Sequence, residues 1–285
     1  FYNSNLALSS YHQLPQTRQK PRSFSQLNYF NKTLIKKIML FYLSLFKNLF
    51  SPFNVFQYIT FRTIGALLTS LFIVMVFGKP FVAWVKRKSI TQTVREDGPQ
   101  SHLGKSGTPT MGGLLILLSL LVSTILWARL DNRFILLILF SAIFLGLLGF
   151  VDDYRKLVLK QSSRGLSQTV KIIFQMIWAV LVVGYLYFYP PNPQFAHLVQ
   201  VPYFKELFWN FSIFIILFGI FVIIGASNAV NLTDGLDGLA CGTLLMSALT
   251  FALFSYLAGH VKLSSYLHLV PVPGAGELSI YLGAM

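Results

Sequence analysis

Phe134–Val151 reads F-I-L-L-I-L-F-S-A-I-F-L-G-L-L-G-F-V, eighteen residues without a charge. A run of this length can cross the apolar core of a bilayer, about 30 Å thick, as an α-helix. The whole chain is similar, because 54% of its 285 residues are hydrophobic and only 11% are charged, whereas soluble domains carry about 25% charged residues. We therefore predict an all-α, polytopic transmembrane helix bundle. The composition excludes a soluble globular domain and a disordered chain.

Six apolar segments are long enough to span a membrane, and a seventh begins near Leu278. Lys79 and Pro80 interrupt the first segment near one end. The six predicted spans are Thr63–Val85, Gly112–Ala128, Phe134–Val151, Ile172–Tyr189, Leu207–Ala226 and Leu239–Gly259.

The distribution of positive charge predicts the orientation of these spans. The chain has 23 Lys and Arg against 9 Asp and Glu, a net charge of +14. Lys and Arg concentrate in loops 86–111 and 152–171, which the positive-inside rule places in the cytoplasm. Loop 227–238 contains neither Lys nor Arg. We place it in the cytoplasm as well, only because successive spans alternate in direction. Cytoplasmic loops beside anionic lipid explain the basic charge, so no nucleic-acid partner is expected.

The first 38 residues differ from the rest of the chain. Segment 1–37 is polar and contains no acidic residue, and its basic residues fall on the face assigned to the outside. We expect residues 1–38 to be an upstream or non-native extension, with a transit or anchoring segment as the alternative. Residues 39–285 are expected to form a single membrane-embedded domain. Its one cysteine, Cys241, excludes an intramolecular disulfide and is predicted to be a small buried residue.

Two of the nine acidic residues, Asp152 and Asp153, are adjacent at the end of the uncharged Phe134–Val151 span. Like charges this close raise each other's pKa unless a cation neutralises them. Arg155 and Lys156 are one source of neutralising charge. A hard divalent cation such as Mg²⁺ is another, because it binds carboxylate and phosphate oxygens together.

A second polar cluster reads N-A-V-N-L-T-D-G-L-D-G-L-A over Asn228–Ala240. Its amide and carboxylate residues recur every third position, and in a helical turn this spacing gathers them on one side. Such a side can hold a ribose or a base, although a helix cap followed by a turn would fit the same residues. The recurring residues are Asn228, Asn231, Asp234 and Asp237.

Loop 86–111 ends in K-S-G-T-P-T-M-G-G, Lys105–Gly113, directly before a predicted span. Its backbone amides and Lys105 form a candidate phosphate cradle. Lys156 and Lys160 are cations suited to a pyrophosphate or a lipid phosphate. These groups share one predicted membrane face, which indicates metal-assisted chemistry on a phosphorylated substrate at the cytoplasmic surface.

Three motifs together resemble the phospho-N-acetylmuramoyl-pentapeptide transferases, within the superfamily of polyprenyl-phosphate sugar-1-phosphate transferases (glycosyltransferase 4). They are G-T-P-T-M-G-G at 107–113, G-F-V-D-D-Y-R-K at 149–156 and the 228–240 motif. The resemblance runs from about Met39 to Met285. It implies a multi-pass enzyme of the bacterial inner membrane whose active site faces the cytoplasm, with a homodimer as the candidate oligomer.

The resemblance also implies a reaction and its residues. The family transfers phospho-MurNAc-pentapeptide from UDP-MurNAc-pentapeptide to undecaprenyl phosphate, giving lipid I and UMP, with Mg²⁺. By matching motifs, the catalytic residues would be Asp152, Asp153 and Asp234, with Asp152 and Asp153 also holding the metal. The residues expected to bind substrate are Lys105, Thr110, Lys156, Lys160, Asn228, Asn231, Gly235, Leu236 and Asp237.

The chain also departs from the family pattern. Family members continue with several more spans, a third active-site Asp and a His-rich loop, whereas Glu277 is the only acidic residue here after Asp237. We therefore expect an enzyme that is incomplete at its C-terminus. The alternatives are a sister transferase that uses another UDP-linked N-acetylhexosamine, an inactive membrane fragment, or a transporter. A transporter would place its acids in the middle of the spans.

Overall fold

The computed structural model describes residues 39–87, 111–157, 165–201, 204, 207–233 and 238–285. The 1–38 segment lies outside these ranges. The described chain is helical apart from one short β-hairpin, which confirms the all-α class. Its six longer helices are α2 (Ile59–Arg87), α3 (Gly113–Trp127), α4 (Arg133–Leu157), α5 (Gln168–Phe188), α6 (Phe214–Thr233) and α7 (Leu239–Gly259).

Shorter elements cap and connect these helices. Strands β1 (Leu198–Gln200) and β2 (Phe208–Asn210) pair in antiparallel fashion, with Val199 opposite Trp209. The short helices are the 3-10 helices η2 (Leu40–Phe46), η3 (Ser51–Gln57), η5 (Pro193–Phe195) and η6 (Ala275–Glu277), and the α-helices α8 (Val261–Tyr266) and α9 (Leu278–Ala284).

Within the described ranges, five helices are long and apolar enough to cross a membrane, namely α2, α4, α5, α6 and α7. The remaining predicted span, Gly112–Ala128, forms α3, which has 15 residues and a length of about 22 Å. This is shorter than a typical bilayer core of about 30 Å. Helix α2 continues through Lys79 and Pro80 to Arg87, so the predicted interruption does not end it.

The fifth predicted span, Leu207–Ala226, is shifted in the structure. Residues Phe208–Asn210 form β2, and α6 begins only at Phe214. The Asn210 side chain accepts a hydrogen bond from the Ser212 N–H at 2.9 Å, and this local turn delays the helix. Helix α6 then runs to Thr233, so Asn228 and Asn231 lie on its last turns rather than in a loop.

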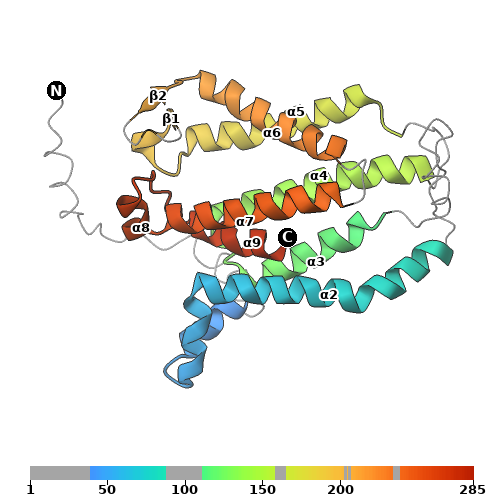
Figure 1. Ribbon diagram of the computed structural model, residues 1–285, viewed down its shortest axis with the longest axis horizontal. Helices are drawn as coiled ribbons and strands as arrows, with labels where there is room; N and C mark the ends of the chain where they lie inside the picture. Colours follow the sequence, from blue (N-terminus) through green and yellow to red (C-terminus); the bar gives the residue numbers. More distant parts are fainter. Residues whose placement is uncertain (1–38, 88–110, 158–164, 202–203, 205–206, 234–237) are drawn as a thin grey trace, which may run out of the picture. The chain divides into compact units, whose positions relative to one another are not determined.

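The helices alternate in direction, as Figure 1 shows. The C-terminal ends of α2, α4 and α6 lie at the end of the bundle away from the β-hairpin and α8, together with the N-terminal ends of α5 and α7. Helix α2 packs on α3 and α9, α9 packs on α7, and α5 packs on α6. The α2–α9 contact is close, because a Cβ on Gly283 would lie 2.6 Å from Thr63 Cγ2, as small residues permit between membrane helices.

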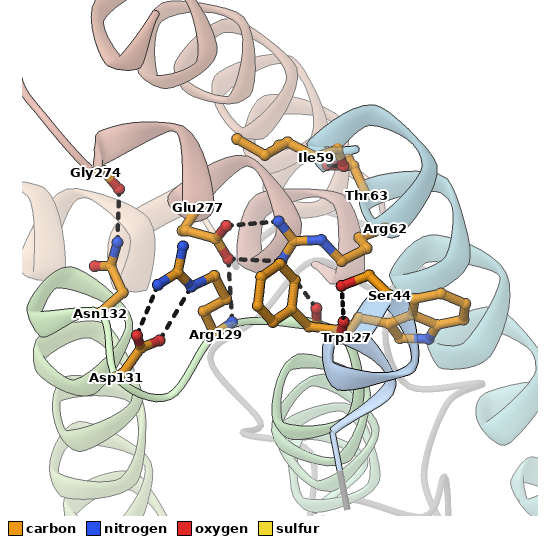
Figure 2. A network of polar contacts seen from close by, with 11 residues as sticks. Ser44, Ile59, Arg62, Thr63, Trp127, Arg129, Asp131, Asn132, Gly274 and Glu277 are labelled. Carbon is orange, nitrogen blue, oxygen red and sulfur yellow. Dashed lines mark hydrogen bonds and ion pairs between the residues drawn. The ribbon is translucent and has the colours of Figure 1, made fainter. Parts of the chain in front are cut away.

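A buried ion pair joins the first and last of these packed helices, at the end of the bundle that carries α8. The guanidinium of Arg62, at the start of α2, donates to both carboxylate oxygens of Glu277 at 2.8 and 2.6 Å. Arg62 is 1% exposed and Glu277 6%. Figure 2 shows that Arg62 also donates to the Trp127 carbonyl, at 3.2 Å, and that the Arg129 N–H donates to Glu277, at 3.1 Å. We call these residues the Arg62–Glu277 cluster.

Candidate active site

Asp152 lies near the C-terminal end of α4 and is 7% exposed. Its Oδ2 accepts from the ammonium of Lys156, one helical turn later, at 2.6 Å. The same oxygen accepts from Lys171, in the first turn of α5, at 2.8 Å. Its Oδ1 accepts from the Leu166 backbone N–H at 2.8 Å. One carboxylate therefore holds two lysines and the start of α5 in place.

Gly165 makes this arrangement possible. Its φ of +65° lies in the left-handed region, where a side chain is strained. A Cβ at this position would also lie 2.5 Å from Asp152 Oδ1 and from Lys156 Cε. Gly165 and Lys171 were not among the predicted site residues, because neither belongs to one of the three motifs. The sequence did contain one indication of a turn here: Gly165 lies two residues before Ser167, whose hydroxyl caps the N-terminus of α5.

Asp153 has different surroundings from Asp152. It is half-buried, and it forms no hydrogen bond or ion pair with any residue that the structure describes. Its carboxylate oxygens are thus available to a ligand, whereas those of Asp152 are already engaged. Neighbouring carboxylates with such different partners can take different roles in one site.

A cavity of about 370 Å³ opens beside Asp152, between α4, α5, α6 and α7. Its polar lining is Asp152, Lys171, Gln175, Ser227 and Asn231, and its apolar lining includes Leu145, Leu148, Val230 and Leu244. Cys241 also lines it and is exposed. The prediction that Cys241 is buried was wrong, because the first turn of α7 faces this open cavity.

The two predicted asparagines face in different directions. Asn231 lines the cavity, whereas Asn228 does not. The Asn228 Nδ2 donates to Gln175 Oε1 on α5 and to the Ile224 carbonyl, both at 2.9 Å. Spacing of three residues on an α-helix separates side chains by about 60°, which is enough to turn one asparagine toward α5 and the other toward the cavity.

The other predicted site residues lie outside the described ranges. They are Lys105, Thr110, Lys160, Asp234, Gly235, Leu236 and Asp237. Within the described part of the chain, no group of three or more His, Cys, Asp and Glu residues could hold a metal ion. Asp153 offers free carboxylate oxygens, so the described residues supply part of a donor set for a hard cation but not a complete one.

Comparisons with known proteins agree with the motifs. Residues 135–276 match Glycosyl transferase family 4, and residues 105–117 match the Phospho-N-acetylmuramoyl-pentapeptide-transferase signature 1. A phospho-N-acetylmuramoyl-pentapeptide-transferase of Endomicrobium trichonymphae is 56% identical over 238 residues, which cover 84% of this chain and 66% of the relative. The protein of that name from Desulfotalea psychrophila is 48% identical over 83% of this chain and 65% of its own length.

A third relative with this name, from Thermodesulfovibrio yellowstonii, is 43% identical over 82% of this chain and 64% of its own length. The chain thus spans just under two thirds of the length of the curated relatives that it matches. The matched residues include α4 to α7, the four helices that surround the cavity.

Proposed function

Because this chain belongs to glycosyl transferase family 4 and carries the phospho-N-acetylmuramoyl-pentapeptide-transferase signature, we propose that the protein catalyses the synthesis of lipid I, a precursor of peptidoglycan. It transfers phospho-MurNAc-pentapeptide from UDP-MurNAc-pentapeptide to undecaprenyl phosphate and releases UMP. The proposal places the protein in the bacterial inner membrane, with its active site facing the cytoplasm and with a homodimer as its assembly. The observation that carries it is the cavity beside the Asp152, Lys156 and Lys171 cluster.

This cavity suits a phosphorylated ligand attached to a lipid. Lys171 lines its polar part beside Asp152, and Lys156 contacts the same Asp152 oxygen; such cations stabilise phosphoryl oxygens. Its opposite lining consists of leucine and valine side chains. A reaction between a nucleotide diphosphate and a polyprenyl phosphate needs a polar surface for the phosphates next to an apolar surface for the lipid chain.

The proposed chemistry is attack of a lipid phosphate oxygen on the phosphorus that is linked to the sugar. The bond from that phosphorus to the bridging oxygen breaks, and its electron pair leaves with UMP. Asp153, with free carboxylate oxygens, accepts the proton of the attacking phosphate. Asp152 positions Lys156 and Lys171, which balance the negative charge of the diphosphate.

The remaining site residues of the proposal are carried over from the motifs. Asp234 is a further proposed catalytic carboxylate, in addition to Asp152 and Asp153. The proposed substrate-binding residues are Lys105, Thr110, Lys156, Lys160, Asn231, Gly235, Leu236 and Asp237. Asn228, which matches the same motif, does not line the cavity and would act through Gln175, to which it donates.

Mg²⁺ belongs to the proposal as the cofactor. Asp153 would hold it through a free oxygen, and Asp152 could join through Oδ1, which accepts one hydrogen bond, from the Leu166 N–H, while Oδ2 holds both lysines. Further ligands would come from the substrate phosphates and from Asp234 or Asp237. When bound, the ion supplies neutralisation of phosphate charge.

Two alternatives are less well supported. The signature at residues 105–117 favours the pentapeptide substrate over other UDP-linked hexosamines. The acids of a transporter would lie at mid-span, whereas Asp152 and Asp153 lie in the last two turns of α4.

The proposed function is tested by measuring UMP release. The protein, expressed from its complete gene and purified in detergent, is mixed with UDP-MurNAc-pentapeptide and undecaprenyl phosphate, with and without Mg²⁺. We expect UMP and lipid I to form together, only with both substrates, and to stop when EDTA removes the metal. Equal turnover of UDP-N-acetylglucosamine would favour the sister transferases, and the absence of any UMP release would contradict the proposal.

A further inference from the structure

Gln175 occupies the wall of the cavity one helical turn after Lys171 on α5. Residues four apart share one face of an α-helix, so the Gln175 amide and the Lys171 ammonium face the same space. Gln175 was not among the residues that the sequence singled out, since it lies inside an apolar span.

Hydrogen bonds fix the orientation of the Gln175 amide. The Ile224 carbonyl can only accept, so the atom of Asn228 that lies 2.9 Å from it must be the nitrogen. That nitrogen is also 2.9 Å from Gln175, which must therefore present its oxygen to Asn228. The Gln175 nitrogen then faces Ser227 Oγ, at 3.1 Å. One backbone carbonyl thus determines both amide orientations, which X-ray density at ordinary resolution would leave open.

This orientation leaves Gln175 with a donor to spare. An amide nitrogen carries two hydrogens, and the Gln175 nitrogen uses one of them for Ser227. Among the described residues, the other hydrogen has no acceptor. Asn228, by contrast, has both amide hydrogens engaged and does not line the cavity.

We propose that Gln175 contacts the substrate by donating a hydrogen bond to a phosphoryl oxygen, and that Asn228 is the positioning residue that holds it in this orientation. The inference rests on the proposed transferase function and extends it. A phosphoryl oxygen is the favoured acceptor, because the neighbouring Lys171 attracts an anion. The phosphoryl group belongs either to the UDP-linked substrate or to the lipid phosphate.

A merely structural bridge between α5 and α6 would affect stability and not substrate affinity, and two variants separate these roles. In Gln175→Glu, the carboxylate can still accept from Asn228 and from the Ser227 hydroxyl, so the bridge is kept, but the donor is lost. In Asn228→Asp, the residue can only accept, which turns the Gln175 nitrogen away from Ser227 and toward position 228. The second variant removes the donor from the cavity without changing Gln175.

Ser141→Ala is the matched control for the loss of an interhelical hydrogen bond. It removes the bond from Trp178 Nε1 to Ser141 Oγ, 3.0 Å long, which joins α5 to α4. Trp178 lies three residues after Gln175 on the same helix, and neither Ser141 nor Trp178 lines the cavity.

The experiment measures steady-state UMP release and the melting temperature in detergent for the wild type and these three variants. The concentration of one substrate is varied while the other is saturating, and then the reverse. We expect Gln175→Glu and Asn228→Asp to raise the KM of one phosphorylated substrate about 10- to 100-fold. Gln175→Glu should melt close to the wild type, whereas Asn228→Asp should melt lower, because an aspartate at position 228 cannot donate to the Ile224 carbonyl. The substrate whose KM rises is the one that carries the contacted phosphoryl group. Ser141→Ala should lower the melting temperature and leave both KM values unchanged.

Unchanged KM values in Gln175→Glu would overturn the inference, and so would KM increases that Ser141→Ala reproduces. A wild-type protein that releases no UMP would contradict the proposed function itself. An active wild type with an unaffected Gln175→Glu variant would contradict only the role of Gln175. The two failures are therefore distinguishable.

Discussion

Asp152 and Asp153 are adjacent in the sequence, but their carboxylates have different hydrogen-bond partners. Asp152 accepts hydrogen bonds from two lysines and one backbone amide, whereas Asp153 makes no such bond within the described residues. The contact with Lys156 could be predicted, because residues four apart on a helix are neighbours. The contacts with Leu166 and Lys171 could not, because they depend on how Gly165, Leu166 and the start of α5 lie against α4.

At this scale we predict that Gly165→Ala impairs the proposed transfer reaction. The substitution places a Cβ in the left-handed region, which costs about 1–2 kcal/mol, and within 2.5 Å of Asp152 Oδ1. Asp152 and Lys156 must then move, and a displacement of about 1 Å in a catalytic group can cost about 10²-fold in rate. We expect kcat/KM for UMP release to fall by about this factor while the protein still inserts into membranes.

Gly184→Ala is the control for this prediction. Gly184 lies on α5, and a Cβ there would meet no atom within 4 Å. Its activity should match that of the wild type. If Gly165→Ala were as active as Gly184→Ala, the loop would not hold Asp152 in the way that the structure indicates.

At the scale of elements, the apolar runs of the sequence predicted where the long helices lie, but they predicted the ends of these helices less accurately. Leu239–Gly259 was predicted with the same bounds that α7 has in the structure. The α6 prediction began seven residues early, because Leu207 to Ser212 includes apolar residues that form β2 and a turn. Apolar character alone does not distinguish a helix start from a short strand that precedes it.

The contact between α2 and η6–α9 was not predictable from local sequence, because Arg62 and Glu277 are 215 positions apart. We predict that Glu277→Gln lowers the free energy of unfolding by about 3–5 kcal/mol, since it leaves the Arg62 charge buried and unpaired. Replacing both residues, as in Arg62→Met with Glu277→Leu, should lose less than the sum of the two single changes. Thermal unfolding and protease resistance in detergent would measure these effects.

The control for the buried Arg62–Glu277 pair is the exposed pair formed by the side chains of Arg129 and Asp131, which are 42% and 46% exposed. Arg129 contacts Glu277 through its backbone N–H, so Asp131→Asn leaves that hydrogen bond in place. Exposed pairs contribute about 0–1 kcal/mol, so Asp131→Asn should change the melting temperature little. Similar melting temperatures for Glu277→Gln and Asp131→Asn would show that the buried pair does not stabilise the α2–α9 contact.

At the scale of the whole molecule, the proposed function requires that the end of the bundle that carries the cavity face the compartment that contains the UDP-linked substrate. The cavity opens near the C-terminal ends of α4 and α6 and the N-terminal ends of α5 and α7. The sequence predicted that the loops following α2, α4 and α6 share one side, and the alternating helices place these helix ends together (Figure 1). Which compartment this side faces stays a prediction of the positive-inside rule.

Cys241 provides the test of orientation without an engineered residue, because it is the only cysteine in the sequence. It is exposed, lies in the first turn of α7 and lines the cavity. If the cavity faces the cytoplasm, a membrane-impermeant maleimide should label the protein in inverted membrane vesicles and in permeabilised cells, but not in intact spheroplasts. Labelling that disappears in Cys241→Ser is labelling of Cys241, so this variant identifies the modified site. Labelling in intact spheroplasts would place the cavity outside, where a cytoplasmic UDP-linked precursor cannot reach it, and the proposed reaction would then be excluded together with the orientation.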